Sequence, residues 1–372
     1  MYHLILLSYW LLFFQRFLRN PYLLSTSELA STFFPHWIWM GTKWRSSDDV
    51  FYKHTACIPF LSMWYPPSVL CSKISKFLSL DVAFRMYTLL ILGHYYLGSI
   101  LAFTMFLQWF SPMQSLFGAL TLTYSAYNIK PQTPCSAFTT AWMMGILIDG
   151  PIGIVSMGMA ILGGYFPILV YFMPIALIIN TESMLGILIG LPQIIPFLWY
   201  WPKSIRHGNE LDRDMGIVKP WKFIDLVRQT KSVTPTGGAH YPEVEMYMGL
   251  APILCFNPDP WWIVVACCIG VACGYLPRIQ HIPCRVFYVL TFAITILALH
   301  SSIAPWMIAL QAYLLMRNAH IYPSFPFSQA WDKPSKLYSE NPYDGTWPNC
   351  TGYLRNIKIS DYKGQFRMRE PA

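Results

Sequence analysis

The stretch from Met86 to Tyr200 carries almost no charge, and it limits what this chain can fold into. Its charged residues are Lys130, Asp149 and Glu182. A helix that crosses a bilayer needs roughly 20 apolar residues, whereas about a quarter of the residues in a soluble domain are charged. Over the whole chain, 12% of the residues are charged and 55% are hydrophobic. We therefore predict an integral membrane protein.

Proline and glycine residues divide this stretch into segments of helical length. The six predicted helices occupy 86–110, 113–127, 135–149, 151–163, 165–179 and 183–200. Further apolar segments lie at 2–18, 246–256, 260–276, 284–300 and 303–316. Several segments are too short to cross a bilayer unbroken, so re-entrant or broken helices are expected. The predicted fold class is an all-α polytopic membrane protein with about ten transmembrane or re-entrant helices.

Polar residues gather between these segments and set the predicted organisation. From the N-terminus, the parts are a first transmembrane helix (1–18), a polar and aromatic loop (19–85), a membrane core (86–200), a second polar loop (201–245), C-terminal transmembrane helices (246–316) and a polar, aromatic-rich tail (317–372). Within the first loop, a helix over 73–85 would place four apolar side chains on one face: Ile74, Phe77, Leu78 and Phe84. This spacing predicts an interfacial helix.

The segment Ser25–Leu70 of the first loop is the best candidate for a functional site. It combines the carboxylates of Glu28, Asp48 and Asp49 with basic, histidine and tryptophan side chains. Unpaired charges are costly in hydrocarbon, and indole rings concentrate at membrane interfaces. We therefore expect a structured aqueous loop that lies on the membrane.

The net charge of +8 and the nine cysteines bear on partners and cofactors. Lys and Arg crowd into the polar stretches, a pattern typical of anchoring by membrane lipids. Membrane lipids are therefore expected partners, and nucleic acid is not. The cysteines are scattered without a CxxC pair, so a metal or redox cluster is not expected. The oligomeric state does not follow from the sequence.

Five short patterns occur in the order typical of the YfhO-like membrane proteins of bacteria. They are Glu28 followed by Pro35 within ELASTFFP, Tyr65-Pro66-Pro67, GGYFPILVYF from Gly163, Pro196 followed by Ser204-x-Arg206 in PFLWYWPKSIRHG, and Tyr247-Met248-Gly249-Leu250-Ala251-Pro252. The chain resembles this family over residues 25–285, in a shortened and divergent form. The family is placed with the GT-C glycosyltransferases.

The resemblance implies a GT-C-like membrane core with a structured first extracytoplasmic loop, in the bacterial inner membrane. The implied reaction transfers a sugar from a polyprenyl-phosphate-linked donor to an extracytoplasmic acceptor. The family places an aspartate in the first loop as the candidate base, and this chain has Glu28 there. Glutamate keeps the carboxylate on a longer side chain, so the geometry must shift. The alternative is a non-enzymatic membrane scaffold or lipid-binding protein that retains the fold.

Each candidate catalytic residue also has a structural interpretation. Glu28 can act as a general base, and the run Ser25–Glu28 can equally start a helix as a capping box. Asp48 and Asp49 can converge on a divalent cation through their oxygen atoms, or they can pair with nearby Lys and Arg in a solvated turn. No cofactor is fixed by these residues.

Arg206, Ser204, His54 and Tyr65 are the candidate substrate-binding residues. Guanidinium binds phosphate in a bidentate manner, so Arg206 is expected to hold the lipid phosphate, with Ser204 beside it in the shared pattern. The alternative for Arg206 is a lipid-headgroup anchor. His54 can transfer protons near neutral pH or lie at the interface without a chemical role. Tyr65 closes the first loop.

Overall fold

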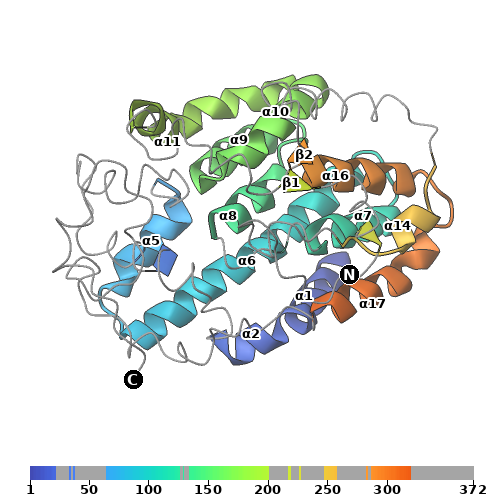
Figure 1. Ribbon diagram of the computed structural model, residues 1–372, viewed down its shortest axis with the longest axis horizontal. Helices are drawn as coiled ribbons and strands as arrows, with labels where there is room; N and C mark the ends of the chain where they lie inside the picture. Colours follow the sequence, from blue (N-terminus) through green and yellow to red (C-terminus); the bar gives the residue numbers. More distant parts are fainter. Residues whose placement is uncertain are drawn as a thin grey trace.

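The computed structural model in Figure 1 describes residues 1–21, 33–34, 37, 64–125, 129, 134–200, 217–218, 226–227, 247–257, 282–283 and 286–319. Its α-helices are α1 (Tyr2–Phe13), α2 (Gln15–Arg19), α5 (Pro66–Ser75), α6 (Leu80–Leu107), α7 (Pro112–Tyr124), α8 (Pro134–Met143), α9 (Pro151–Gly163), α10 (Phe166–Ile179), α11 (Gly186–Tyr200), α14 (Ala251–Leu254), α16 (Val286–Leu299) and α17 (Ile308–Ala319). The 3-10 helices η4 (Thr181–Leu185) and η7 (Ala304–Met307) precede α11 and α17. One short antiparallel ladder pairs β1 (Ile217–Val218) with β2 (Ile282–Pro283). The predicted all-α class is confirmed.

Two helices in the described part of the chain are long and apolar enough to cross a membrane, Asp81–Leu107 and Thr181–Trp199. The pair Tyr288–Leu299 and Ala304–Arg317, bent by 120°, makes a third span if it is counted as one. These helices support membrane association. The predicted core of ten helices is not confirmed, and the predicted segment 260–276 lies outside the described residues.

Proline and glycine set the ends of α9, as the sequence predicts. Gly150 has a φ of 73° and Gly164 a φ of 92°, in the left-handed region that glycine enters without strain. Pro151 begins the helix, where its missing N–H leaves no hydrogen bond unmade. The helix therefore occupies Pro151–Gly163, which matches the predicted bounds.

The predicted interfacial helix over 73–85 is wrong as a single helix. Helix α5 ends at Ser75, and α6 begins at Leu80 after a turn. The Ser79 hydroxyl accepts a hydrogen bond from the Val82 N–H at 3.4 Å. This side chain caps a new helix, and the chain reverses direction instead of continuing along one axis.

The predicted N-terminal span 2–18 is divided between α1 and α2. The break lies at Phe14, whose backbone angles of −98° and 9° leave the helical range. On α1, Trp10 donates its indole N–H to the Leu92 carbonyl of α6 at 2.7 Å. The first helix is therefore held on α6 by a polar contact as well as by packing.

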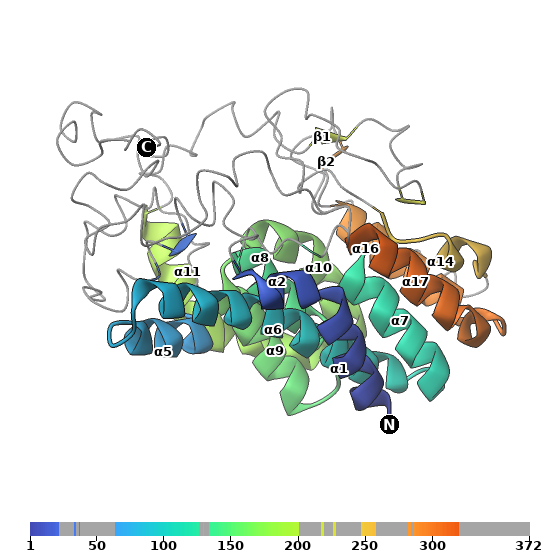
Figure 2. The ribbon, with the colours of Figure 1, turned by 90° about the horizontal axis from the view of Figure 1, so that it is seen from below.

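Helix α6 is the central element of the structure. It contacts α1, α5, α7 and α8, and α8 in turn contacts α9. Helices α16 and α17 pack against α7, and α11 packs against α9. Figure 2 shows the helices as a layer, with β1 and β2 on one side of it. The long helix thus connects the N-terminal, middle and C-terminal parts of the chain.

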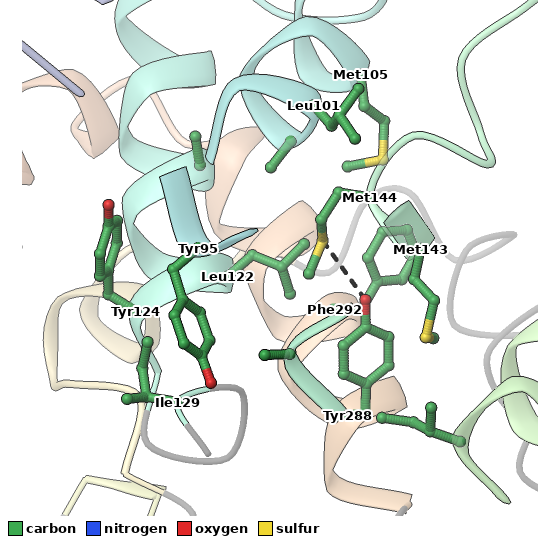
Figure 3. Close-up of a cluster of buried hydrophobic side chains, with 14 of the residues drawn as sticks. Tyr95, Leu101, Met105, Leu122, Tyr124, Ile129, Met143, Met144, Tyr288 and Phe292 are labelled. Carbon is green, nitrogen blue, oxygen red and sulfur yellow. Dashed lines mark hydrogen bonds between the residues drawn. The ribbon is translucent and has the colours of Figure 1, made fainter. Parts of the chain in front are cut away.

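The core between these helices is rich in aromatic and sulfur-containing side chains (Figure 3). Tyr288 of α16 donates its hydroxyl hydrogen to the sulfur of Met144 at 3.4 Å. The ring of Phe172 meets Tyr288 edge to face, with the centroids 5.7 Å apart. A thioether is a weak acceptor, but it satisfies a hydroxyl group that is buried completely. These contacts join α10, α16 and the segment after α8.

Amide side chains close several breaks between the helices. Three of them donate an N–H to a carbonyl that ends or follows a helix: Asn180 to Ile146 (3.0 Å) and Ile148 (2.8 Å), Gln108 to Leu147 (3.0 Å), and Gln114 to Leu299 (2.6 Å). Gln311 donates to the carbonyl of Met248 (2.7 Å), just before α14. A helix end leaves about four carbonyls without intrahelical partners, and hydrocarbon contains no water to satisfy them. The amides therefore allow helices to end inside an apolar layer.

Helices α9 and α11 meet along a seam of glycine residues. A Cβ atom added to Gly186 would overlap the Ile154 carbonyl oxygen and lie 2.8 Å from the backbone nitrogen of Gly158. A Cβ atom on Gly158 would come within 2.5 Å of the Ile189 Cβ. The two backbones are therefore nearly in contact, which is how small residues allow membrane helices to associate.

We predict that Gly186→Ala lowers the free energy of unfolding by at least ~1–3 kcal/mol, because the added methyl group meets backbone that cannot move aside. Gly93→Ala is the matched control, since a Cβ on Gly93 would have no neighbour within 4 Å. The control should leave stability unchanged or raise it by up to ~1 kcal/mol, because alanine favours a helix. Denaturant titration of both variants in detergent tests the prediction. Equal stabilities would contradict the close seam.

Candidate functional site

Among the residues predicted to form a site, the structure describes Tyr65. The others lie outside the described residues: Glu28, Asp48, Asp49, His54, Ser204 and Arg206. Their roles stay predictions. The flanks of the loop that carries the first four can nevertheless be followed, because Phe34, Trp37 and Tyr65 are described.

The hydroxyl of Tyr65 lies in a buried hydrogen-bond network between three helices. Tyr65 is the residue immediately before α5. Trp142, in the last turn of α8, donates its indole N–H to the Tyr65 hydroxyl oxygen at 2.6 Å. The Nε2 atom of His94, from the middle of α6, is the second partner. Tyr65 has no exposed surface, and His94 is also buried. The C-terminal flank of the loop is therefore fixed to two parts of the helical layer at once.

The geometry of this network shows which of its atoms carry hydrogen. The Nδ1 atom of His94 lies 2.6 Å from the Leu90 carbonyl oxygen, which can only accept, so Nδ1 carries a hydrogen. In a neutral imidazole Nε2 then accepts, and the Tyr65 hydroxyl donates to it. Burial raises the pKa of Tyr65 well above its usual range, against the opposing effect of the hydrogen bond from Trp142. The phenol therefore keeps the proton that it donates to His94.

The ring of Phe138 covers this network. It stacks on the Tyr65 ring, with the centroids 5.0 Å apart and an angle of 20° between the planes. The centroid of the His94 ring lies 4.5 Å from that of the Phe138 ring. An aromatic pair of this kind contributes ~0.5–1.5 kcal/mol beyond its buried area. In apolar surroundings of this kind, hydrogen bonds are stronger than in water, and an unpaired polar group costs more free energy.

Trp37 fixes the loop a second time, closer to its N-terminal flank. Its indole N–H donates to the Ser68 carbonyl of α5 at 3.1 Å. Its ring stacks on Tyr87 of α6, with the centroids 4.7 Å apart. Phe34 meets Phe84, also of α6, edge to face at 5.0 Å. Both loop residues are buried. Both flanks of the loop are therefore held on α6, with further contacts to α5 from Trp37 and to α8 from Tyr65.

The hydrogen-bond network of Tyr65, His94 and Trp142 can hold the C-terminal flank of the loop in a fixed position. The Tyr65 hydroxyl is occupied by Trp142 and His94, so a role of Tyr65 in substrate binding stays a prediction. Among the described residues, no group of three or more His, Cys, Asp or Glu side chains could hold a metal ion. Asp149 and Glu182 are exposed near helix ends, outside this network. The catalytic roles predicted for the loop carboxylates stay predictions.

Sequence reasoning missed His94 and Trp142. An ionisable residue within a long apolar segment usually pairs with another group or marks a functional site, and His94 lies within the predicted helix 86–110. That signal was sufficient to single it out. Trp142 offers no comparable signal, because tryptophan is common in membrane proteins. Its partner Tyr65 is 77 residues away in the chain.

The comparisons with known proteins identify no relative. No protein-family model matches the chain, and no match was found among curated proteins or among solved structures. The resemblance to the YfhO-like family therefore rests on the sequence patterns alone.

We predict that His94→Leu lowers the free energy of unfolding by ~1–3 kcal/mol, because it leaves the buried Tyr65 hydroxyl without its acceptor. The double variant with Tyr65→Phe should lose less than the sum of the two single losses, by ~0.5–3 kcal/mol, because the two groups share one hydrogen bond. Denaturant unfolding of the four proteins in detergent measures this coupling. His3→Leu, an exposed histidine on α1, is the control and should change stability by less than ~0.5 kcal/mol. Strictly additive losses would show that the two side chains do not interact.

Proposed function

We propose that this protein is an integral membrane glycosyltransferase of the GT-C type, located in the bacterial inner membrane. It transfers a sugar from a polyprenyl-phosphate-linked donor to an acceptor at the extracytoplasmic face. The ordered sequence patterns and the apolar helices support this proposal. The observation that carries it is the anchoring of the first loop, whose two flanks are fixed by Trp37 and Tyr65 to the helical layer.

The anchoring is relevant because catalytic groups must be held within about 0.5 Å of a productive geometry. Ordering one residue of a free loop costs roughly 1–2 kcal/mol of conformational entropy. The contacts of Trp37 with Ser68 and of Tyr65 with His94 and Trp142 offset part of this cost at the flanks of the loop. The carboxylates of Glu28, Asp48 and Asp49 lie in or beside the segment that these contacts bound in the sequence.

In the proposed reaction, the carboxylate of Glu28, or of Asp48 or Asp49, takes the proton from the acceptor hydroxyl. The acceptor oxygen forms a bond to the anomeric carbon as the bond from that carbon to the lipid phosphate breaks. The sugar passes through an oxocarbenium-like state, and Arg206 holds the departing phosphate. A general base of this kind contributes a factor of ~10²–10⁴ in rate.

We predict that Glu28→Gln abolishes sugar transfer and changes the free energy of unfolding by less than ~0.5 kcal/mol, because the amide keeps the shape of the side chain but cannot take a proton. Glu28→Asp should retain activity. The assay uses the purified full-length protein in nanodiscs with a radiolabelled polyprenyl-phosphate sugar. Thermal unfolding of the same samples monitors stability, with Glu28→Ala as the reference for loss of a helix cap.

Two outcomes would contradict this assignment of Glu28. Normal transfer by Glu28→Gln would exclude it as the base. A loss of stability in Glu28→Gln equal to that in Glu28→Ala would favour the helix-capping interpretation. If neither the parent protein nor any variant releases labelled sugar from the donor, the non-enzymatic alternative, a scaffold or lipid-binding protein with this fold, is preferred.

We also predict that Arg206→Ala weakens the binding of a polyprenyl-phosphate analogue by roughly tenfold to a hundredfold, because a charge-assisted hydrogen bond is lost. Arg206→Lys should restore the affinity only in part, because an ammonium group lacks the fork of the guanidinium. Lys203→Ala, in the same loop, controls for the loss of one positive charge. Affinities measured with the full-length protein in detergent test this. Unchanged affinity in both Arg206 variants would assign Arg206 to headgroup anchoring.

A further inference from the structure

Helix α5 presents its apolar side chains outward and its polar side chains inward. Ser68, Ser72 and Ser75 are buried, at most 4% exposed, and their spacing places them on one side of a helix that contacts α6. On the outer side, Leu70 is 63% and Ile74 is 43% exposed. A helix on the surface of a water-soluble protein has the opposite distribution. The outer side of α5 is therefore adapted to an apolar environment.

The inward serines are compatible with this arrangement. The Ser72 hydroxyl donates to the Val69 carbonyl at 3.0 Å, and the Ser75 hydroxyl donates to the Ser72 carbonyl at 2.6 Å. Each hydroxyl is thus satisfied within its own helix and needs no partner on α6. Small side chains at these positions also allow α5 to approach α6 closely. Figure 2 shows the two helices side by side, with their connecting turn at the edge of the helical layer.

Phe77 continues the apolar face of α5 into the turn. It is 79% exposed, which is unusual for so large an apolar side chain. The Lys76 ammonium group lies over its ring, 4.6 Å from the centroid. The aromatic ring and the cation are therefore presented together at the end of the helical hairpin.

Positive charge gathers around this turn. Lys73 lies in the last turn of α5, and Lys76 follows it. Arg85 lies near the start of α6 with its side chain exposed, and it pairs with Asp81 at 3.1 Å. In the sequence from Pro66 to Leu107, these three cations are accompanied by one carboxylate, that of Asp81. These basic side chains lie beside the apolar face formed by Leu70, Ile74 and Phe77.

We propose that the α5–α6 turn binds anionic phospholipid of the bilayer. Leu70, Ile74 and Phe77 insert among the acyl chains near the interface, and Lys73 and Lys76 contact the lipid phosphates. An aromatic ring beside basic residues is the combination that places a helix at the headgroup level. Long lysine side chains can lie along the apolar surface while their charged ends reach the phosphates.

Charge complementarity favours a lipid headgroup as the occupant of this face. Helix α11 provides the comparison, because it also exposes large apolar side chains, such as Leu188 and Leu198. Its sequence from Gly186 to Tyr200 contains no charged residue. That composition fits contact with acyl chains alone. The cations beside the apolar face of α5 allow a headgroup contact that the residues of α11 themselves cannot make.

The test measures the affinity of the full-length protein, in detergent, for phosphatidylglycerol and for phosphatidylcholine by native mass spectrometry. The parent protein should prefer phosphatidylglycerol. Lys73→Gln combined with Lys76→Gln should weaken phosphatidylglycerol binding by roughly tenfold to thirtyfold, because each lysine near an anionic surface contributes about fivefold. Lys73→Arg with Lys76→Arg should keep the preference. Arg16→Gln with Arg19→Gln in α2 removes the same charge elsewhere and should have a smaller effect.

Three outcomes would overturn the proposal. The first is phosphatidylglycerol affinity at the parent level in the double glutamine variant. The second is a preference of the parent protein that does not weaken as the salt concentration rises, since screening must reduce a headgroup contact; this measurement needs no variant to fold. The third is a Phe77→Ser variant that changes oligomeric state while its lipid affinity stays unchanged, which would assign the face to contact with a second copy of the chain.

Discussion

The arrangement of helices depends on side-chain amides that satisfy backbone groups where helices break. Asn180 shows the principle most clearly, because its NH₂ group bonds two carbonyls, of Ile146 and Ile148, after α8 ends. In an apolar layer an unsatisfied carbonyl costs several kcal/mol. A helix as short as α8, with 10 residues, is marginal by itself. The amide makes such short helices compatible with a membrane environment, so the chain can turn at Gly150 and enter α9.

Local signals in the sequence explain which parts of the fold could be predicted. Gly150, Pro151 and Gly164 fix the ends of α9 through their own backbone preferences, and these ends were predicted correctly. The helix predicted over 73–85 failed because its apolar spacing continues across a turn. The Ser79 cap that starts α6 was read as part of that helix. Periodicity reports which residues can share a face, but it does not report where the chain reverses.

The candidate site was predictable only in part, because its contacts join residues far apart in the chain. Tyr65 was identified from a pattern at the end of the loop, whereas Trp142 lies 77 residues beyond it and has no local signal. His94 did carry such a signal, as an ionisable residue in an apolar helix. The pairing of the three depends on α5, α6 and α8 packing together, and no short motif encodes that packing. Networks of this kind therefore emerge only from the tertiary structure.

Helix α5 relates the loop to the membrane. At one end, Tyr65 enters the network with His94 inside the helical layer. At the other end, the helix leads to Lys76 and Phe77 in the turn that we propose to contact lipid headgroups. Because a helix of 10 residues is a short, stiff element, a lipid contact at one end restricts the position of the other. The hydroxyls of Ser72 and Ser75 bond within α5, so these small side chains need no polar partner on the neighbouring helix. In the proposed enzyme, the bilayer and the Tyr65 network would thus act together to hold the base of the loop.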